Sequence, residues 1–232
     1  AVDRAQGGRA LLRGIFVTGT DTGVGKTVVS AALMRRYGTH GNVHYWKPIQ
    51  TGIEVDDDTA EVARLSGVAA VEPLPGSLRL NRPVSPHLAA RLAGRRITVD
   101  DLLVGARAAA SLGRWVVEGA GGVLVPINER SLMVDLVMAL GLPTVVVARS
   151  ALGTINHTLL TLEALRGRQI AVVGVVLVGT PDAHNRDAIA EYGGVAILGE
   201  LPMLQPLSAE ALTRWADDSL DPAGRVGEVL RC

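Results

Sequence analysis

The sequence predicts an α/β fold built on a mostly parallel, doubly wound sheet with helices on both faces. Apolar, β-branched runs alternate with helical segments, and these runs are continuously apolar, as is typical of strands buried on both faces. The expected strands are residues 15–18, 43–46, 115–117, 144–147, 171–178 and 195–198. The expected helices are residues 26–37, 57–65, 98–112, 131–140, 155–165, 182–192 and 208–215.

Turn and capping residues set the boundaries of several elements. The first strand ends in glycine, and Gly38 stops the helix that follows it. The second strand ends at a Lys-Pro pair, and acidic residues occupy the first turn of the helix at 57–65. Thr98 caps the next helix, with Asp101 in an imperfect capping box. The proline-rich residues 72–86 form a long connection, which is either a surface loop or part of a ligand crevice.

The composition is that of an ordinary globular domain. The chain has 232 residues, 48% of them hydrophobic, and its 23 basic side chains balance 23 acidic ones. This balance gives no electrostatic basis for binding nucleic acid or a membrane, and no apolar run reaches the roughly 18 residues of a spanning helix. The single Cys232 excludes a disulfide framework. We expect a cytoplasmic protein with one domain at 15–232, after a disordered or non-native extension at 1–14.

Lysine is almost absent from the chain. Of the 23 basic residues only two, Lys26 and Lys47, are lysines, and the rest are arginines. An ammonium group is a compact point charge, whereas a guanidinium group is a planar fork. The two lysines are therefore either chance survivors of a codon bias or positions where arginine would not serve.

A glycine-rich loop joins the first strand to the first helix. Residues 19–27 read GTDTGVGKT, which is one residue longer than the usual phosphate-binding loop. Its backbone N–H groups and the helix N-terminus can bind phosphate oxygens, Lys26 can reach the β- and γ-phosphates, and Thr27 can ligate Mg²⁺. The loop predicts a P-loop NTPase fold; the alternative is a plain turn with an incidental lysine.

A dinucleotide-binding fold is a weaker alternative. Residues 119–124 give G-x-G-x-x-L after the third strand, but the third glycine is missing. Pro126 also follows where a helix should begin.

Two groups of carboxylates are candidate metal ligands. Asp56, Asp57 and Asp58 precede a helix, where acids are often only a solvated first turn. Glu118 ends a buried strand, so its charge must be exposed or neutralised by a cation, either a metal or a structural arginine. The carboxyl edge of a parallel sheet is where ligands bind. Lys47 ends the second strand at the same edge, as a functional residue or a surface lysine.

Four blocks in order resemble dethiobiotin synthetase. They are the long phosphate loop, Lys47–Gly52 (KPIQTG), Val117–Gly122 (VEGAGG) and Leu152–His157 (LGTINH), and the resemblance extends from about residue 15 to 204. It implies a Mg²⁺-dependent ligase of biotin biosynthesis that uses ATP and CO₂ (or bicarbonate) to convert 7,8-diaminononanoate into the cyclic urea dethiobiotin. It also implies a homodimer in which the helix start near Gly153 binds the substrate carboxylate across the interface, although sequence alone favours an ordinary helix start.

The resemblance assigns roles residue by residue. Lys26 and Lys47 would be catalytic, and Thr27, Asp58 and Glu118 would ligate Mg²⁺, with Asp57 as the alternative to Asp58. The substrate would contact Thr22, Thr51, Gly153, Thr154, Ile155 and Asn156. The nucleotide would contact Gly23, Val24, Gly25, Lys26, Thr27, Val28, Asp58, Glu118, Gly119, Ala120, Gly121, Val178, Gly179, Pro202, Met203 and Leu204.

Differences between this sequence and the patterns of related families narrow the range of possible functions. Partitioning ATPases carry a second lysine near the start of the loop, where this chain has Thr20 or Asp21. P-loop amidoligases usually carry a glutamine-handling domain, for which this chain has no length. Dethiobiotin synthetases often have an Asn-Asp pair that reads adenine, but residues 178–181 here read VGTP, so we expect base recognition through the backbone.

Overall fold

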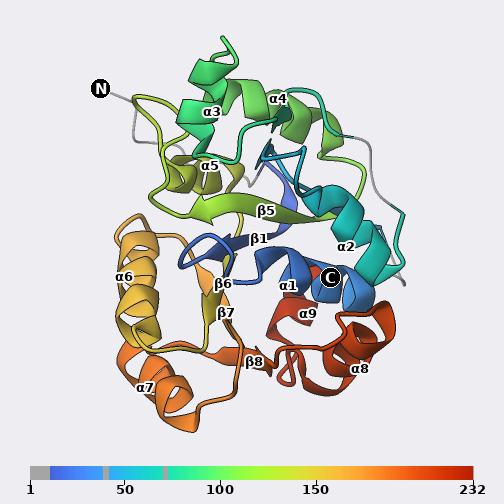
Figure 1. Ribbon diagram of the computed structural model, residues 1–232, viewed down its shortest axis with the longest axis vertical. Helices are drawn as coiled ribbons and strands as arrows, with labels where there is room; N and C mark the ends of the chain where they lie inside the picture. Colours follow the sequence, from blue (N-terminus) through green and yellow to red (C-terminus); the bar gives the residue numbers. More distant parts are fainter. Residues whose placement is uncertain (1–10, 39–41, 70–72, 232) are drawn as a thin grey trace.

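Six parallel strands form the central sheet of the protein. The computed structural model describes residues 11–38, 42–69 and 73–231. The strand order is β2-β5-β1-β6-β7-β8, and every neighbouring pair is parallel (Figure 1). The strands are β1 (Arg13–Gly19), β2 (Val43–Trp46), β5 (Arg114–Gly122), β6 (Thr144–Arg149), β7 (Val172–Val178) and β8 (Ile197–Leu201). The predicted fold class is confirmed.

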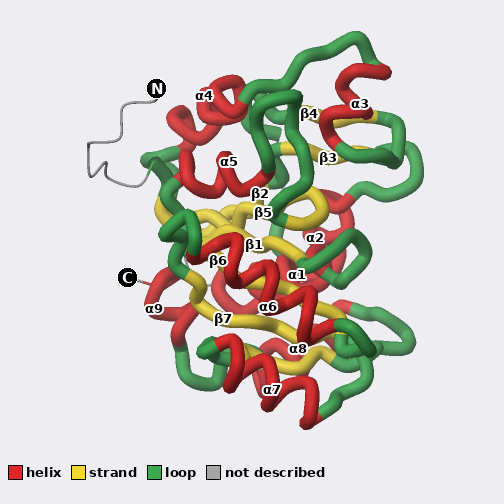
Figure 2. Tube along the Cα trace, turned by 90° about the vertical axis from the view of Figure 1, so that its left-hand side faces the viewer, coloured by secondary structure: helices red, strands yellow, loops and turns green. Residues whose placement is uncertain are grey.

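Helices cover both faces of this sheet (Figure 2). The seven predicted helices correspond to α1 (Lys26–Gly38), α2 (Asp58–Ser66), α4 (Val99–Ala109), α5 (Met133–Leu140), α6 (Thr154–Arg166), α7 (Ala183–Gly193) and α8 (Ala209–Ser219). Thr98 and Asp101 form the full capping box at the start of α4, so aspartate serves where glutamate is usual. None of the helices in the described ranges is long and apolar enough to cross a membrane.

Four elements were not predicted from the sequence. Two short strands, β3 (Ile49–Thr51) and β4 (Leu78–Leu80), pair in parallel to form a small second sheet. The helices α3 (Pro86–Leu92) and α9 (Arg225–Arg231) are short as well. Three residues give too little periodicity to identify a strand, and β3 and β4 form only because they pair with each other. The expected connection at 72–86 therefore contains β4 within its described part.

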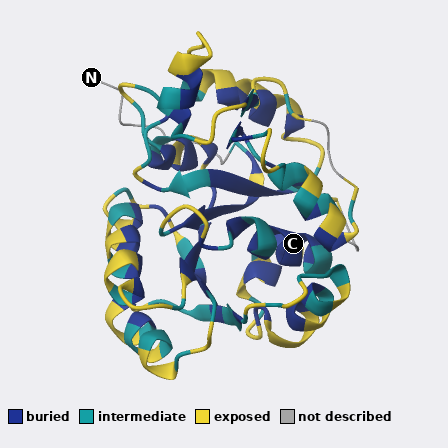
Figure 3. Cartoon of the chain, viewed as in Figure 1, coloured by how far each residue is buried: buried dark blue, intermediate teal, exposed yellow. Residues whose placement is uncertain are grey.

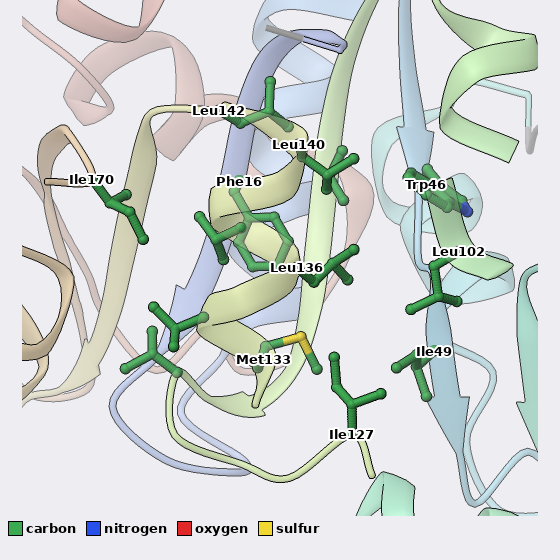
Figure 4. Packing of buried hydrophobic residues seen from close by; sticks show 14 of the residues in the cluster. Phe16, Trp46, Ile49, Leu102, Ile127, Met133, Leu136, Leu140, Leu142 and Ile170 are labelled. Carbon is green, nitrogen blue, oxygen red and sulfur yellow. The ribbon is translucent and has the colours of Figure 1, made fainter. Parts of the chain in front are cut away.

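The alternation of side chains along β1 divides the interior into two cores. Ile15 and Val17 pack among α1, α2, α8 and α9, whereas Phe16 packs on the opposite face with residues of α4, α5, α6 and α7. Figure 4 shows Phe16 beside Leu136 and Leu140 of α5. Figure 3 shows the strands buried while the outer helix faces are exposed. The sheet is thus covered on both faces, which explains its continuously apolar strands.

The folded domain begins a few residues before the expected residue 15. The strand β1 begins at Arg13, and Leu12 is buried beside it. The rest of the expected N-terminal extension, residues 1–10, lies outside the described residues.

A buried aspartate ties the C-terminal helix to the end of α1. Asp221 Oδ2 accepts hydrogen bonds from the Tyr37 hydroxyl at 2.6 Å and from the backbone N–H groups of Val226 and Gly227 at 2.9 and 3.0 Å. Burial, together with the Asp221 carboxylate, raises the pKa of Tyr37 to about 12. The phenol therefore remains a donor throughout the physiological pH range.

We predict that Asp221→Ala lowers the free energy of unfolding by about 2–4 kcal/mol, because three donors around a buried site lose their acceptor. Urea denaturation monitored by circular dichroism measures the change. Asp187→Ala is the control, since this aspartate is exposed and its ion pair in the described part of the chain is with the half-buried Arg186, and its effect should stay within about 0.5 kcal/mol. Equal effects of the two variants would contradict the prediction.

Candidate functional site

The phosphate loop lies at the carboxyl end of β1 and leads directly into α1. Gly23 and Gly25 have φ values of +68° and +99°, which L side chains rarely adopt. A Cβ at Gly25 would lie 3.0 Å from Val178 Cγ1 at the end of β7, so the loop packs closely on the sheet. Lys26 Nζ donates to the carbonyl oxygen of Asp21 at 2.9 Å, which folds the lysine back over its own loop.

Four side chains meet beside this loop: three come from α1, α2 and β5, and the fourth, Lys47, directly follows β2. Lys47 Nζ lies 2.5 Å from Asp58 Oδ2 and 2.7 Å from Glu118 Oε1. Thr27 Oγ1 lies 2.6 Å from Asp58 Oδ1 and 3.1 Å from Glu118 Oε1. The side chain of Lys47 is 7% exposed and that of Glu118 is fully buried. The sheet topology thus brings together the second lysine and three residues that the resemblance assigns to a metal.

Sequence reasoning missed Tyr45, which completes the environment of Glu118. Its buried hydroxyl donates to Glu118 Oε2 at 3.0 Å. Burial, and then the carboxylates of Glu118 and Asp58, raise the pKa of Tyr45 well above its ordinary value, so the phenol stays protonated. The signal was available, since residues two apart on a strand share a face and Tyr45 precedes Lys47 by two.

Asp57 and Asp58, two of the three consecutive aspartates, have different environments. Asp57 caps α2 by accepting from the N–H groups of Thr59 and Ala60 at 3.1 and 3.2 Å, and it pairs with Arg79 at 2.7 Å. The Arg79 hydrogen bond lowers the pKa of Asp57. Asp58, the next residue, is the one that reaches Thr27 and Lys47. Arg79 comes from β4, so nothing local in the sequence predicts this partner.

Burial and charge act in opposite directions on the two lysines. Burial lowers the pKa of Lys26 to about 8, with Glu118 opposing and Lys47 adding to the shift. Burial also disfavours the charge on Lys47, but the carboxylates of Glu118 and Asp58 outweigh it and raise the pKa of Lys47. The pKa of Asp58 is lowered: burial opposes this shift, but Lys47 and then Thr27 outweigh it. Lys47 and Asp58 therefore form an ion pair.

These groups line an open cleft of about 980 Å³ at the carboxyl edge of the sheet. The volume is of the order expected for a nucleotide with a second small ligand. Predicted site residues on its wall are Thr22, Gly23, Gly25, Lys26, Thr27, Val28, Lys47, Thr51, Asp58, Glu118, Ala120 and Gly121. The cleft also includes residues 83–86, so part of the expected proline-rich connection does line it.

The oxygen atoms in this cleft fit a magnesium ion. One hydroxyl lies within hydrogen-bonding distance of two carboxylates, and Mg²⁺ prefers a few such oxygen ligands together with substrate phosphates. Within the described ranges, no cluster of three or more His, Cys, Asp or Glu side chains could hold a metal ion. Any metal here would therefore depend on Thr27, Asp58 and Glu118 with phosphate or water ligands.

The other predicted nucleotide contacts lie outside the cleft wall. Val24 is buried, and Gly119 packs on the ring of Phe16. The carbonyl of Val178 accepts from Ser150 N at 2.7 Å, and the N–H of Gly179 donates to Leu201 O at 2.9 Å, so these two groups already have partners. Along the segment Pro202, Met203 and Leu204, Met203 is exposed.

The segment predicted to bind the substrate carboxylate forms the start of α6. Gly153 precedes the helix with a φ of +92°, and Thr154 is buried. Ile155 is half-buried and Asn156 is exposed. Neither these residues nor their side chains line the cleft within this chain.

Arg149 is a further contact to the phosphate loop that sequence reasoning missed. Its guanidinium lies 3.1 Å from Asp21 Oδ2 and 3.4 Å from the carbonyl of Thr22. It follows a buried apolar run at the end of β6 and is half-exposed. A charged residue at the carboxyl end of a central strand was the available signal.

Comparison with known proteins agrees with this site. A family model described as "AAA domain" matches residues 13–211. The chain is 49% identical to the ATP-dependent dethiobiotin synthetase BioD of Paramagnetospirillum magneticum over 201 residues, covering 87% of this chain and 93% of that protein. It is 47% identical to the BioD of Brucella ovis over 198 residues, covering 85% and 90%. It also matches the biotin biosynthesis bifunctional protein BioCD of Bordetella avium at 47% identity, over 88% of this chain but 42% of that longer protein.

Solved structures with low sequence identity share the fold. A ParA family ATPase from Chlorobium tepidum matches with a TM-score of 0.59 and 14% identity, over 95% of this chain and 99% of that one. The septum site-determining protein MinD from Pyrococcus horikoshii matches with a TM-score of 0.53 and 14% identity, over 93% of each chain. These likenesses show the P-loop fold alone, whereas the sequence relatives show the family: the chain belongs to the ATP-dependent dethiobiotin synthetases, ligases of biotin biosynthesis.

Proposed function

We propose that the chain forms dethiobiotin from 7,8-diaminononanoate, CO₂ and ATP with Mg²⁺, as a cytoplasmic homodimer. The observation that carries the proposal is the contact of Lys47 and Thr27 with Asp58 and Glu118 at the mouth of the phosphate loop. Thr51 lines the same cleft and provides a hydroxyl for the diamine.

The chemistry brings two anions together. One amine of the substrate captures CO₂ as a carbamate and loses a proton. The carbamate oxygen then attacks the γ-phosphorus, and ADP leaves. The second amine attacks the carbonyl carbon of the resulting mixed anhydride, closes the five-membered ring and expels phosphate. Positive charge in the cleft offsets the repulsion between carbamate and triphosphate.

Lysine ammonium groups provide this charge on both sides of the transferred group. Lys26 begins α1 beneath the phosphates, where it neutralises the β- and γ-oxygens along with the N–H groups of Gly23 and Gly25. Lys47 follows β2 on the side of Thr51, where it stabilises the carbamate. Mg²⁺, when bound by Thr27, Asp58 and Glu118, would add charge neutralisation at the phosphate oxygens.

The deciding experiment measures ADP release from ATP with 7,8-diaminononanoate and bicarbonate. We expect release only when the diamine is present, with dethiobiotin formed in equal amount. Lys26→Ala is the control for a contaminating ATPase, since loss of this contact should cost on the order of 3–5 kcal/mol of transition-state stabilisation. ADP release that does not depend on the diamine, or a Lys26→Ala rate within about tenfold of the wild type, would refute the proposal.

Separate substitutions test the metal ligands. Glu118→Gln and Asp58→Asn remove a charge and keep the shape, so half-maximal activity should require a higher Mg²⁺ concentration. Asp57→Asn makes the same change one residue away, at a side chain held by Arg79, and the Mg²⁺ titration should stay as in the wild type. If Asp57→Asn shifted the titration as far as Asp58→Asn, Asp57 would be the ligand instead.

Exposed leucines support a homodimer through α6. Leu152 is fully exposed just before the helix, and Leu160 is exposed on the same face as Asn156. Apolar side chains at this position would be covered by a second copy, whose cleft then receives the start of α6. This arrangement would explain why these residues do not line the cleft of their own chain.

We predict that Leu152→Glu converts a dimer into a monomer and raises the KM for the diamine, because a buried charge disfavours the interface. Multi-angle light scattering gives the mass. Leu112→Glu is the matched control: Leu112 is also exposed but lies after α4, where its carbonyl contacts His44 of the edge strand β2 rather than α6. A wild-type protein that is monomeric at micromolar concentration would exclude this interface.

A further inference from the structure

We infer that Lys47 is an internal counter-ion for the two metal-binding carboxylates, and that binding of the metal–nucleotide releases it toward the substrate side of the cleft. The inference rests on the proposed function, which it deepens by coupling the two halves of the site. The inference follows from the hydrogen bonds and ion pairs that the carboxylate oxygens of Asp58 and Glu118 already make.

Each oxygen of the two carboxylates has a partner. Glu118 Oε2 accepts from the Tyr45 hydroxyl at 3.0 Å, which leaves Oε1 for the cleft. Oε1 is 2.7 Å from Lys47 Nζ and 3.1 Å from Thr27 Oγ1. Asp58 Oδ2 is 2.5 Å from Lys47 Nζ, and Oδ1 is 2.6 Å from Thr27 Oγ1. The ammonium therefore occupies an oxygen of each carboxylate that would ligate the metal.

The metal and the Lys47 ammonium compete for the carboxylates of Asp58 and Glu118. The nucleotide phosphates bring negative charge of their own, but the metal and the ammonium both require oxygen atoms of the same two carboxylates, and cations that share ligands in a buried site repel each other. Lys26 adds a further positive charge nearby, since it pairs with a backbone carbonyl rather than with a carboxylate. Entry of the metal thus disfavours the present position of Lys47.

The cleft offers the Lys47 side chain an alternative position. Pro48 restrains the backbone that follows it, but the side chain has four rotatable bonds and projects into the cleft that Thr51 and Ser85 also line. Release places the charge where the carbamate forms. The site would then offer Lys47 to the substrate only after the metal–nucleotide has bound, which favours an ordered reaction.

Lysine NMR provides a direct test on the wild-type protein, because the chain has only two lysines. In protein labelled with ¹³C at lysine Cε, Lys26→Arg or Lys47→Arg assigns the two side-chain signals. With saturating ADP and EDTA, we expect the Lys47 signal to show the restricted motion of an ion-paired side chain. Saturating Mg²⁺ with ADP should shift it and raise its ¹³C{¹H} heteronuclear NOE, because this NOE increases when a side chain becomes more mobile. A Lys47 signal that remains immobile in Mg²⁺–ADP would overturn the inference.

A pair of matched variants tests the competition without nucleotide or turnover. Lys47→Met removes the competing cation, so Mn²⁺ binding measured by electron paramagnetic resonance should tighten by about tenfold or more. Lys26→Met removes the same charge from a group that touches neither carboxylate, and its effect should be clearly smaller. Equal tightening in both variants, or none in Lys47→Met, would contradict direct competition.

The two hypotheses can fail separately. If the Lys47 signal is released by Mg²⁺–ADP but ADP formation does not depend on the diamine, the coupling stands and the proposed substrate is wrong. If turnover is normal and Lys47 stays immobile, the function stands and the release is excluded.

Discussion

The organisation of the site depends on the burial of one carboxylate. Glu118 is fully buried within β5, and an isolated charge there would cost several kcal/mol. Three donors satisfy it: the phenol of Tyr45, the hydroxyl of Thr27 and the ammonium of Lys47. Tyr45 lies in β2, Lys47 follows that strand, and Thr27 lies at the start of α1 after the phosphate loop. One buried charge therefore fixes the relative positions of side chains from three parts of the chain.

The topology of the sheet makes this arrangement possible. The order β2-β5-β1 inserts the distant strand β5 between two strands that are consecutive in the chain, and all three are parallel, so their carboxyl ends share one edge (Figure 1). The second sheet adds Arg79 on β4, which holds Asp57 as the cap of α2 and leaves Asp58 to enter the site. The helix cap thus decides which of two neighbouring acids contacts Lys47 and Thr27.

The same fold occurs in the ParA and MinD proteins, which belong to other families. The likeness to ParA and MinD ATPases at 14% identity extends over nearly the whole chain, but it describes only the sheet and its helices. Near the start of the loop this chain has Asp21, whose carboxylate pairs with Arg149, rather than a lysine. A shared fold does not imply a shared function, so the function of this chain has to be argued from the side chains of its site.

The sequence by itself determined the fold class, the phosphate loop and the family, because continuous apolar strands and a motif of fixed spacing are local patterns. It also singled out Lys26 and Lys47 by their rarity. Only the tertiary structure revealed the roles of Tyr45 and Arg79, and the difference between Asp57 and Asp58. These depend on pairing across strands that are far apart in the chain, and such pairing is decided by burial and charge in the folded protein rather than by any neighbour in sequence.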